Sequence, residues 1–211
     1  MKKAAFLLVL LIGPALSVYA QPRLTLYAHT GLSLPTFPAS LTDFYQTGLH
    51  LSAGAGLSLA RRTEVVVSAH FSRSRLNHNA LLNELEVFDV VEVALDGGDY
   101  AWFGLTADLK YDIYAQSRIG PYALIGVGVF NSSIDDLVIV EPSGTATRPG
   151  SDEIILGLNG GIGFYVPVAP SLRLVLEPRY TLLLTNDQLL FGTDQTRHFL
   201  QIRAGIALGP F

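Results

Sequence analysis

The chain has 211 residues, of which 49% are hydrophobic and only 15% charged, and its formal net charge is −4. This length suits one domain, and the acidic balance disfavours nucleic acid as a partner. Because the chain has no cysteine, thiol catalysis, metal–thiolate sites and disulfide scaffolds are excluded.

Residues 1–20 have the features of a secretory signal peptide. Two lysines precede a short apolar run that Gly13 ends, and Ala20 stands before the expected cleavage site. The apolar run is well short of the ~20 residues that a spanning helix needs. We therefore predict an exported chain whose mature part, residues 21–211, forms a single domain.

Eight stretches of the mature chain alternate apolar residues with polar or small ones at a period of two, which is typical of β-strands with two unlike faces. Bilayer-spanning strands need about 9–11 residues, whereas soluble strands average about 5–6. The predicted strands are long enough to span a membrane. They cover residues 24–32, 49–59, 64–72, 102–114, 122–129, 156–165, 172–182 and 200–208.

Short and long connections alternate between these strands. Turns of a few residues are expected at 60–63, 115–118 and 167–170, and long loops at 35–46, 74–99, 131–153 and 185–197. Bacterial outer-membrane barrels have this arrangement, with the short turns facing the periplasm. The pattern predicts an all-β fold: an eight-stranded antiparallel transmembrane up-and-down β-barrel, expected to be a monomer in a bacterial outer membrane.

The charged residues are sorted by position. Fourteen of the eighteen acidic residues lie in the four long loops, and the other four lie in the inward register of the strands, together with four bases. Side chains fill an eight-stranded barrel, and buried charges must be paired. We therefore predict a charge network in the lumen. It comprises Glu64, Asp108, Lys110, Asp112, Arg173, Glu177, Arg179 and Arg203.

Aromatic residues near the strand ends predict two belts that anchor the barrel at the membrane interfaces. Ordinary β-propensity is the alternative explanation for any single one of them. Phe199 lies out of the outward register and fits a belt less well. The expected belts contain Tyr111 and Phe164 toward the short turns, and Phe71, Phe103, Tyr180 and Phe199 toward the long loops.

Three glycine-rich or alternating segments carry a family resemblance: GPYALIGVGVF (120–130), LGLNGGIGFYV (156–166) and LRLVLEPRY (172–180). With them, the chain resembles the outer-membrane β-barrel domain family, which includes the OmpA transmembrane domain and OmpX-like small barrels. The resemblance covers about residues 22–211. It implies outer-membrane lipid and the outer-membrane insertion machinery as partners. That machinery reads a terminal aromatic, here Phe211, which stands one place out of the outward alternation.

One pattern is similar to the His-x-Ser…Glu of lipid A deacylases: His70 and Ser72, followed by Glu84. A histidine can activate a serine hydroxyl while a carboxylate orients the histidine. However, His70 and Ser72 lie in the inward register, away from lipid. We favour polar residues that line the lumen and expect no enzyme activity.

Metal binding is also considered and disfavoured. His29, His50 and His70 all face inward and could together bind a metal, but we expect their heights in the barrel to differ and no carboxylate spacing supports a site, so hydrogen-bonded lumen histidines are favoured. The acidic loop 84–99 lacks the ligand spacing of an EF-hand, so a solvated loop is favoured over a calcium site. No cofactor is expected.

Arg73 and Arg75 stand where the third strand leaves the membrane. Arginine suits bidentate contacts to lipid phosphate, and ordinary snorkelling at the interface is compatible with the same placement. The function expected from the whole sequence is structural or interactive, with acidic loops outside the cell. The alternatives are a lipid A-modifying enzyme and a small diffusion pore, which the filled lumen disfavours.

Overall fold

The computed structural model of the protein describes residues 23–84, 94–113, 119–142, 144–184 and 196–210. The predicted signal peptide and the terminal Phe211 lie outside these ranges, so both stay predictions. None of the helices within the described ranges is both long and apolar enough to cross a membrane.

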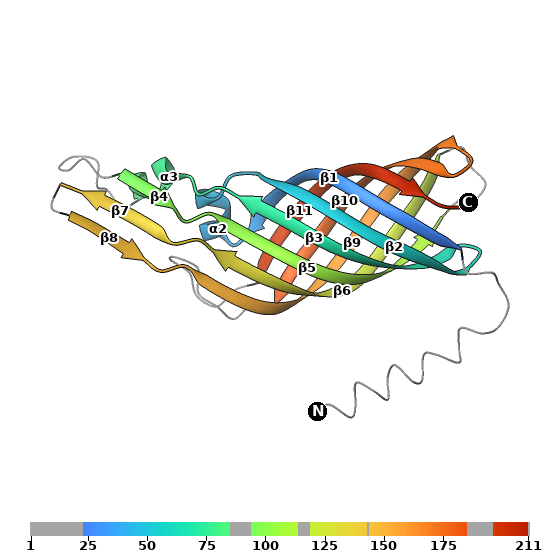
Figure 1. Cartoon of the computed structure of the whole chain (residues 1–211), viewed down its shortest axis with the longest axis horizontal. Helices are drawn as coiled ribbons and strands as arrows, with labels where there is room; N and C mark the ends of the chain where they lie inside the picture. The colour runs from blue at the N-terminus through green and yellow to red at the C-terminus, as the bar shows by residue number, and fades with distance from the viewer. Residues whose placement is uncertain (1–22, 85–93, 114–118, 143, 185–195, 211) are drawn as a thin grey trace, which may run out of the picture.

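Eight strands form a closed barrel in which each strand pairs antiparallel with its neighbours (Figure 1). The order around the barrel is β1-β11-β10-β9-β6-β5-β3-β2, which is the up-and-down connectivity and confirms the predicted fold class. The barrel strands are β1 (Leu24–Phe37), β2 (Gly48–Ala60), β3 (Thr63–Ser74), β5 (Tyr100–Asp112), β6 (Gly120–Ile134), β9 (Ser151–Ala169), β10 (Leu172–Leu184) and β11 (Arg197–Leu208).

Several strands are longer than predicted, mainly at the end that carries the long connections. The pairing of β6 with β9 continues as far as Ile134 opposite Ser151, although residues 131–153 were expected to form a loop. The opposite end has tight turns, as expected: Arg61-Arg62 joins β2 to β3, and Pro170-Ser171 joins β9 to β10. The predicted turn 115–118 lies outside the described residues.

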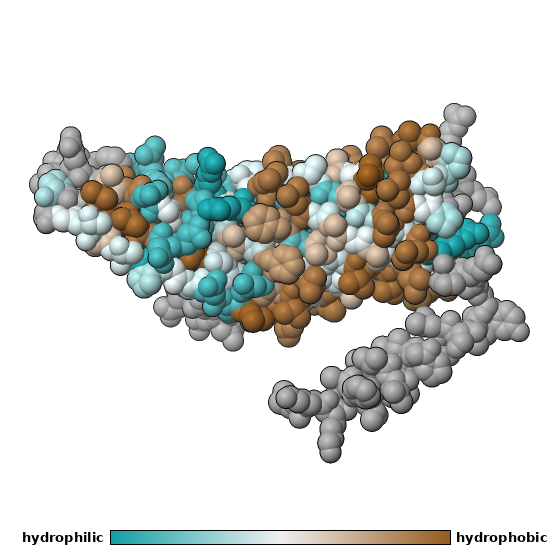
Figure 2. All heavy atoms as spheres, in the orientation of Figure 1, coloured by the Kyte–Doolittle hydropathy of each residue, from teal (hydrophilic) through white to brown (hydrophobic). Residues whose placement is uncertain are grey.

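The two faces of each strand differ as the alternation predicts. On β5, Trp102 and Asp108 are 2% and 1% exposed, whereas Phe103, Leu105 and Leu109 are about half exposed. The outward residues of the other strands give the barrel a largely apolar outer surface, and hydrophilic residues gather toward the long-connection end (Figure 2). So large an apolar surface is typical of contact with lipid rather than water.

The aromatic belts are present with one exception. The five outward members Phe71, Phe103, Tyr111, Phe164 and Tyr180 are 40–48% exposed. The assignment of Phe199 to a belt is wrong. Its side chain is fully buried inside the barrel, because it shares the inward face of β11 with Gln201 and Arg203.

All four long connections were expected to be loops, but the described parts of three of them form a cap that projects beyond the barrel (Figure 1), whereas residues 185–195 of the fourth lie outside the described residues. The elements of the cap are α2 (Ala39–Phe44), α3 (His78–Glu84), β4 (Ala94–Gly97), β7 (Leu137–Glu141) and β8 (Gly144–Arg148). The three strands form a sheet in the order β4-β7-β8. Leu41, Leu76, Leu81 and Leu137 are each 5% exposed or less, and their burial explains why these segments order against the barrel mouth.

The membrane-facing surface leads to a test at Val127, which lies in the middle of β6 and is 59% exposed. Val127→Arg would place a charge in hydrocarbon and should lower the free energy of unfolding by about 2–4 kcal/mol. The matched control is Thr145→Arg on the exposed strand β8 of the cap, which should change it by less than about 0.5 kcal/mol. Urea unfolding in lipid vesicles measures both. Equal costs at the two sites would contradict the placement of the barrel wall in lipid.

Candidate functional site

Four predicted lumen residues form a central charge cluster: Asp108, Glu177, Arg179 and Arg203, each 3% exposed or less. Glu177 on β10 lies opposite Arg203 on β11, and Arg203 Nε donates to Glu177 Oε1 at 3.0 Å. Arg179 Nε donates to the same oxygen at 3.0 Å. Its Nη2 pairs with Asp108 Oδ2 across the lumen at 2.8 Å. Two carboxylates therefore balance two guanidinium groups.

Neutral polar groups complete the hydrogen bonding of the two central carboxylates. Tyr122 Oη donates to Glu177 Oε2 at 2.6 Å. Thr106 Oγ1 donates to Asp108 Oδ2 and Asn159 Nδ2 to Asp108 Oδ1, each at 3.2 Å. Because buried charges are costly unless they are both paired and hydrogen-bonded, these contacts explain how the cluster is tolerated in the lumen.

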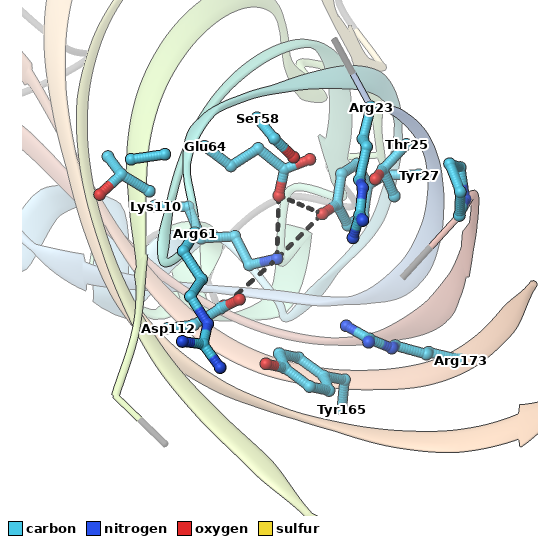
Figure 3. A pocket seen from close by; sticks show the side chains of 13 residues that line it. Arg23, Thr25, Tyr27, Ser58, Arg61, Glu64, Lys110, Asp112, Tyr165 and Arg173 are labelled. Carbon is cyan, nitrogen blue, oxygen red and sulfur yellow. Dashed lines mark hydrogen bonds and ion pairs between the residues drawn. The ribbon is translucent and has the colours of Figure 1, made fainter. Parts of the chain in front are cut away.

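A second group of predicted residues lies at the short-turn end and is called here the mouth cluster: Glu64, Lys110 and Asp112 (Figure 3). Lys110 Nζ lies 3.1 Å from Glu64 Oε2 and 3.8 Å from Asp112 Oδ1. Tyr27 Oη donates to Glu64 Oε2 at 2.6 Å. The Lys110 ammonium also lies 4.7 Å from the centroid of the Tyr122 ring, within cation–π range.

The structure thus divides the ion-paired lumen residues between two clusters: Asp108, Glu177, Arg179 and Arg203 in the centre, and Glu64, Lys110 and Asp112 at the short-turn end. The eighth, Arg173, lies at the short-turn end with its guanidinium carbon 4.5 Å from the centroid of the Tyr165 ring. The expected network thus takes the form of two ion-paired clusters that share Tyr122 as a neighbour, because its hydroxyl donates to Glu177 and its ring lies beside the Lys110 ammonium.

An aromatic plug lies beyond the central cluster, toward the long-connection end: Tyr100, Trp102, Phe130 and Phe199, each 2% exposed or less. The Trp102 ring lies 5.5 Å from the Phe130 ring and 6.0 Å from the Phe199 ring, measured between centroids. Phe199 stacks on Tyr100 at 5.6 Å. The plug belongs to the same buried apolar cluster as the cap residues Leu41 and Leu81, so the lumen is closed on this side.

Sequence reasoning missed the plug and a nearby ion pair. Arg197 is 2% exposed, donates from Nη1 to Ser132 Oγ at 2.6 Å, and lies 3.6 Å from Glu153. Both charged residues had been assigned to loops. The inward register of Trp102 and Phe199 was the available signal for the plug.

Searches with the sequence found neither a matching protein-family model nor a matching curated protein. Comparison of the structure with solved structures found Neisserial surface protein A at a TM-score of 0.56 and 16% identity, covering 88% of this chain and 96% of that one. A major outer membrane protein from Thermus thermophilus matches at a TM-score of 0.56 and 14% identity, covering 90% and 100%. The fold is that of the small outer-membrane β-barrels. Together with the apolar outer surface, it places the protein in a bacterial outer membrane.

In this outer-membrane barrel, Arg73 already has carboxylate partners. Its Nε donates to Asp99 Oδ2 at 3.2 Å and its Nη2 to Asp135 Oδ2 at 2.9 Å, both in exposed positions. Arg75 is exposed, and its carbonyl accepts a hydrogen bond from Gln46 N. Contact of Arg73 and Arg75 with lipid phosphate stays a prediction. For Arg73, such a contact would require its guanidinium to donate to the phosphate as well as to Asp99 and Asp135.

The outer-membrane barrel does not assemble the deacylase-like residues. Ser72 is 1% exposed inside the lumen, and His70 Nε2 is hydrogen-bonded to Thr106 Oγ1 at 3.0 Å. Glu84 is exposed at the end of α3 in the cap. No hydrogen bond among the described residues joins any two members of this set.

The three inward histidines of the outer-membrane barrel lie near one another on β1, β2 and β3, where His29 pairs with Ser52 and Ser52 pairs with His70. His29 Nδ1 lies 3.4 Å from Ser52 Oγ, and the rings of His50 and His70 are 5.6 Å apart between centroids. Within the described residues, no group of three or more histidines and acids is arranged to hold a metal ion. Residues 85–93 of the acidic segment lie outside the described residues.

The central cluster predicts a large cost for removing Glu177. Glu177→Ala leaves two buried guanidinium groups short of a partner and should lower the free energy of unfolding by about 3–5 kcal/mol. Leu174→Ala, on the lipid-facing side of the same strand, keeps its lipid environment and should cost about 1–3 kcal/mol. Urea unfolding in the same vesicles compares them. A neutral Glu177→Ala would mean that water, rather than paired side chains, solvates the arginines.

Proposed function

We propose that this outer-membrane barrel is a non-catalytic, non-conducting envelope protein that presents an acidic cap outside the cell for interaction with positively charged partners. The observation that carries the proposal is the closure of the lumen. The central charge cluster blocks the middle of the barrel, and the aromatic plug blocks the long-connection end.

A pore function is disfavoured by the same contacts. An ion that crossed the barrel would have to displace the Arg179–Asp108 and Arg203–Glu177 pairs, whose side chains are 3% exposed or less. It would then have to pass between Trp102, Phe130 and Phe199, whose rings are in contact. A static barrel of this kind offers no continuous aqueous path.

A lipid-modifying activity has little support in the geometry. A nucleophile for lipid must be reached from the bilayer or from the membrane surface, but Ser72 points into the closed lumen. The Nε2 atom of the nearby His70 is hydrogen-bonded to the Thr106 hydroxyl rather than to Ser72. We therefore retain the non-catalytic interpretation.

The cap has an accessible polar surface. Long connections face the cell exterior in bacterial outer-membrane barrels. The cap and the strand ends beside it carry exposed acids, which include Asp43, Glu84, Asp96, Asp136 and Asp152. Such a surface attracts cationic groups at long range and speeds their association, which supports a role in surface interaction.

Neutralising the cap acids tests this proposal. A variant that carries all four substitutions Asp43→Asn, Glu84→Gln, Asp96→Asn and Asp152→Asn should bind polylysine more weakly, by about tenfold or more at low salt. Low salt screens surface charges only weakly, so the loss of four negative charges has its largest effect under that condition. Binding to the purified protein in lipid nanodiscs is measured by biolayer interferometry.

The control for the cap variant is Asp112→Asn, which removes an acid from the opposite end of the barrel and should leave polylysine binding unchanged. Surface labelling of intact cells verifies that the cap faces outward. If the cap variant and the wild type bind equally, the acidic cap is not an interaction surface for cations.

A further inference from the structure

A cavity of about 210 Å3 opens at the short-turn end of the barrel (Figure 3). The chain termini of the barrel and the β2–β3 turn form part of its rim, through Arg23, Pro210 and Arg61. The mouth cluster forms its inner wall. In outer-membrane barrels this end faces the periplasm, so the cavity is accessible to periplasmic solutes.

The described residues that line the cavity carry surplus positive charge. Its cations are Arg23, Arg61, Lys110 and Arg173, and its carboxylates are Glu64 and Asp112, which leaves two positive charges in excess. Both carboxylates already lie beside the Lys110 ammonium, at 3.1 and 3.8 Å. When Lys110 and Arg173 are counted against these two carboxylates, the surplus is supplied by Arg23 and Arg61.

The three arginines stand around the opening (Figure 3). Arg23 continues the inward register of Thr25 and Tyr27, both buried, and therefore faces the lumen side. None of the ion pairs among the described residues includes Arg23 or Arg61. The guanidinium carbon of Arg173 lies over the Tyr165 ring, 4.5 Å from its centroid. Guanidinium groups from three separate parts of the chain thus converge on one space.

We propose that this cavity binds a phosphate group. Guanidinium donors form a planar fork that matches the oxygens of phosphate, and the hydroxyls of Thr25 and Ser58 in the lining can donate further hydrogen bonds. The phosphate comes from a periplasmic solute or from a phospholipid headgroup of the periplasmic leaflet. This site is independent of the cap function and lies at the other end of the molecule.

The chain offers a matched pair for the test. Arg61 and Arg62 are adjacent and exposed in the same turn, but only Arg61 lines the cavity. Arg61→Gln and Arg62→Gln remove the same charge. Isothermal titration calorimetry with inorganic phosphate, in dodecyl maltoside and phosphate-free buffer, should show saturable binding to the wild type. Arg61→Gln should weaken it by about tenfold, as expected for a charge-assisted contact, and Arg62→Gln by less than about twofold.

A variant of opposite sign strengthens the test. Asp112→Asn removes a carboxylate from the lining and should tighten phosphate binding several-fold, because it raises the positive surplus. The change of gel mobility on boiling verifies that each variant is folded. The double variant Arg23→Gln with Arg61→Gln should bind phosphate more weakly than either single variant.

A second arm identifies the source of the phosphate. Dihexanoylphosphatidylethanolamine, a short-chain lipid, is titrated into the same protein. If it competes with inorganic phosphate and its binding is weakened by Arg61→Gln, the ligand is a headgroup; if only inorganic phosphate binds, the ligand is a solute. The proposal is overturned if neither probe binds saturably at millimolar concentration, or if Arg61→Gln and Arg62→Gln have equal effects.

Discussion

The pairing of buried charges in a narrow barrel is the constraint on which the rest of the structure depends. An eight-stranded barrel leaves room for side chains but not for a water column. Arg179 and Arg203 lie in this space and need carboxylates, which Asp108 and Glu177 provide at hydrogen-bonding distance. Small residues make the space: a Cβ on Gly126 would collide with Asp108 Oδ1. The central cluster thus joins β5 to β10 and β11 across the lumen.

The closed lumen determines where function can reside. Apolar residues of the cap continue the aromatic plug into one buried cluster, so the cap and the barrel mouth are stabilised together. The outward residues of the barrel strands form an apolar surface that contacts lipid. Within the described part of the chain, the acidic cap at one end and the arginine-lined cavity at the other are solvent-accessible polar surfaces, and we propose separate binding roles for them.

Much of the barrel could be predicted because residues that face the membrane are apolar and residues that face the lumen are polar or small, and the two kinds alternate along each strand. The segment 102–114 shows this clearly, and the inward position of all four non-loop acids followed from the same rule. The polar residues Asn131, Ser132 and Ser133 interrupt the apolar alternation, so this extension of β6 was assigned to a loop, although Ser132 is buried and hydrogen-bonded to Tyr100 and Arg197. Contacts across the lumen, such as Arg179 with Asp108, depend on strand order and stagger, which one sequence does not determine. Phe199 was misplaced because proximity to a strand end was weighed above its inward register.

Single-channel conductance tests the closed lumen most directly. The purified barrel is inserted into planar bilayers and recorded across a range of voltages in concentrated potassium chloride. We expect no steady ion current from the wild type, because the central cluster and the aromatic plug occupy the lumen. A steady, voltage-independent current from the folded wild type would contradict the account and would favour a diffusion pore.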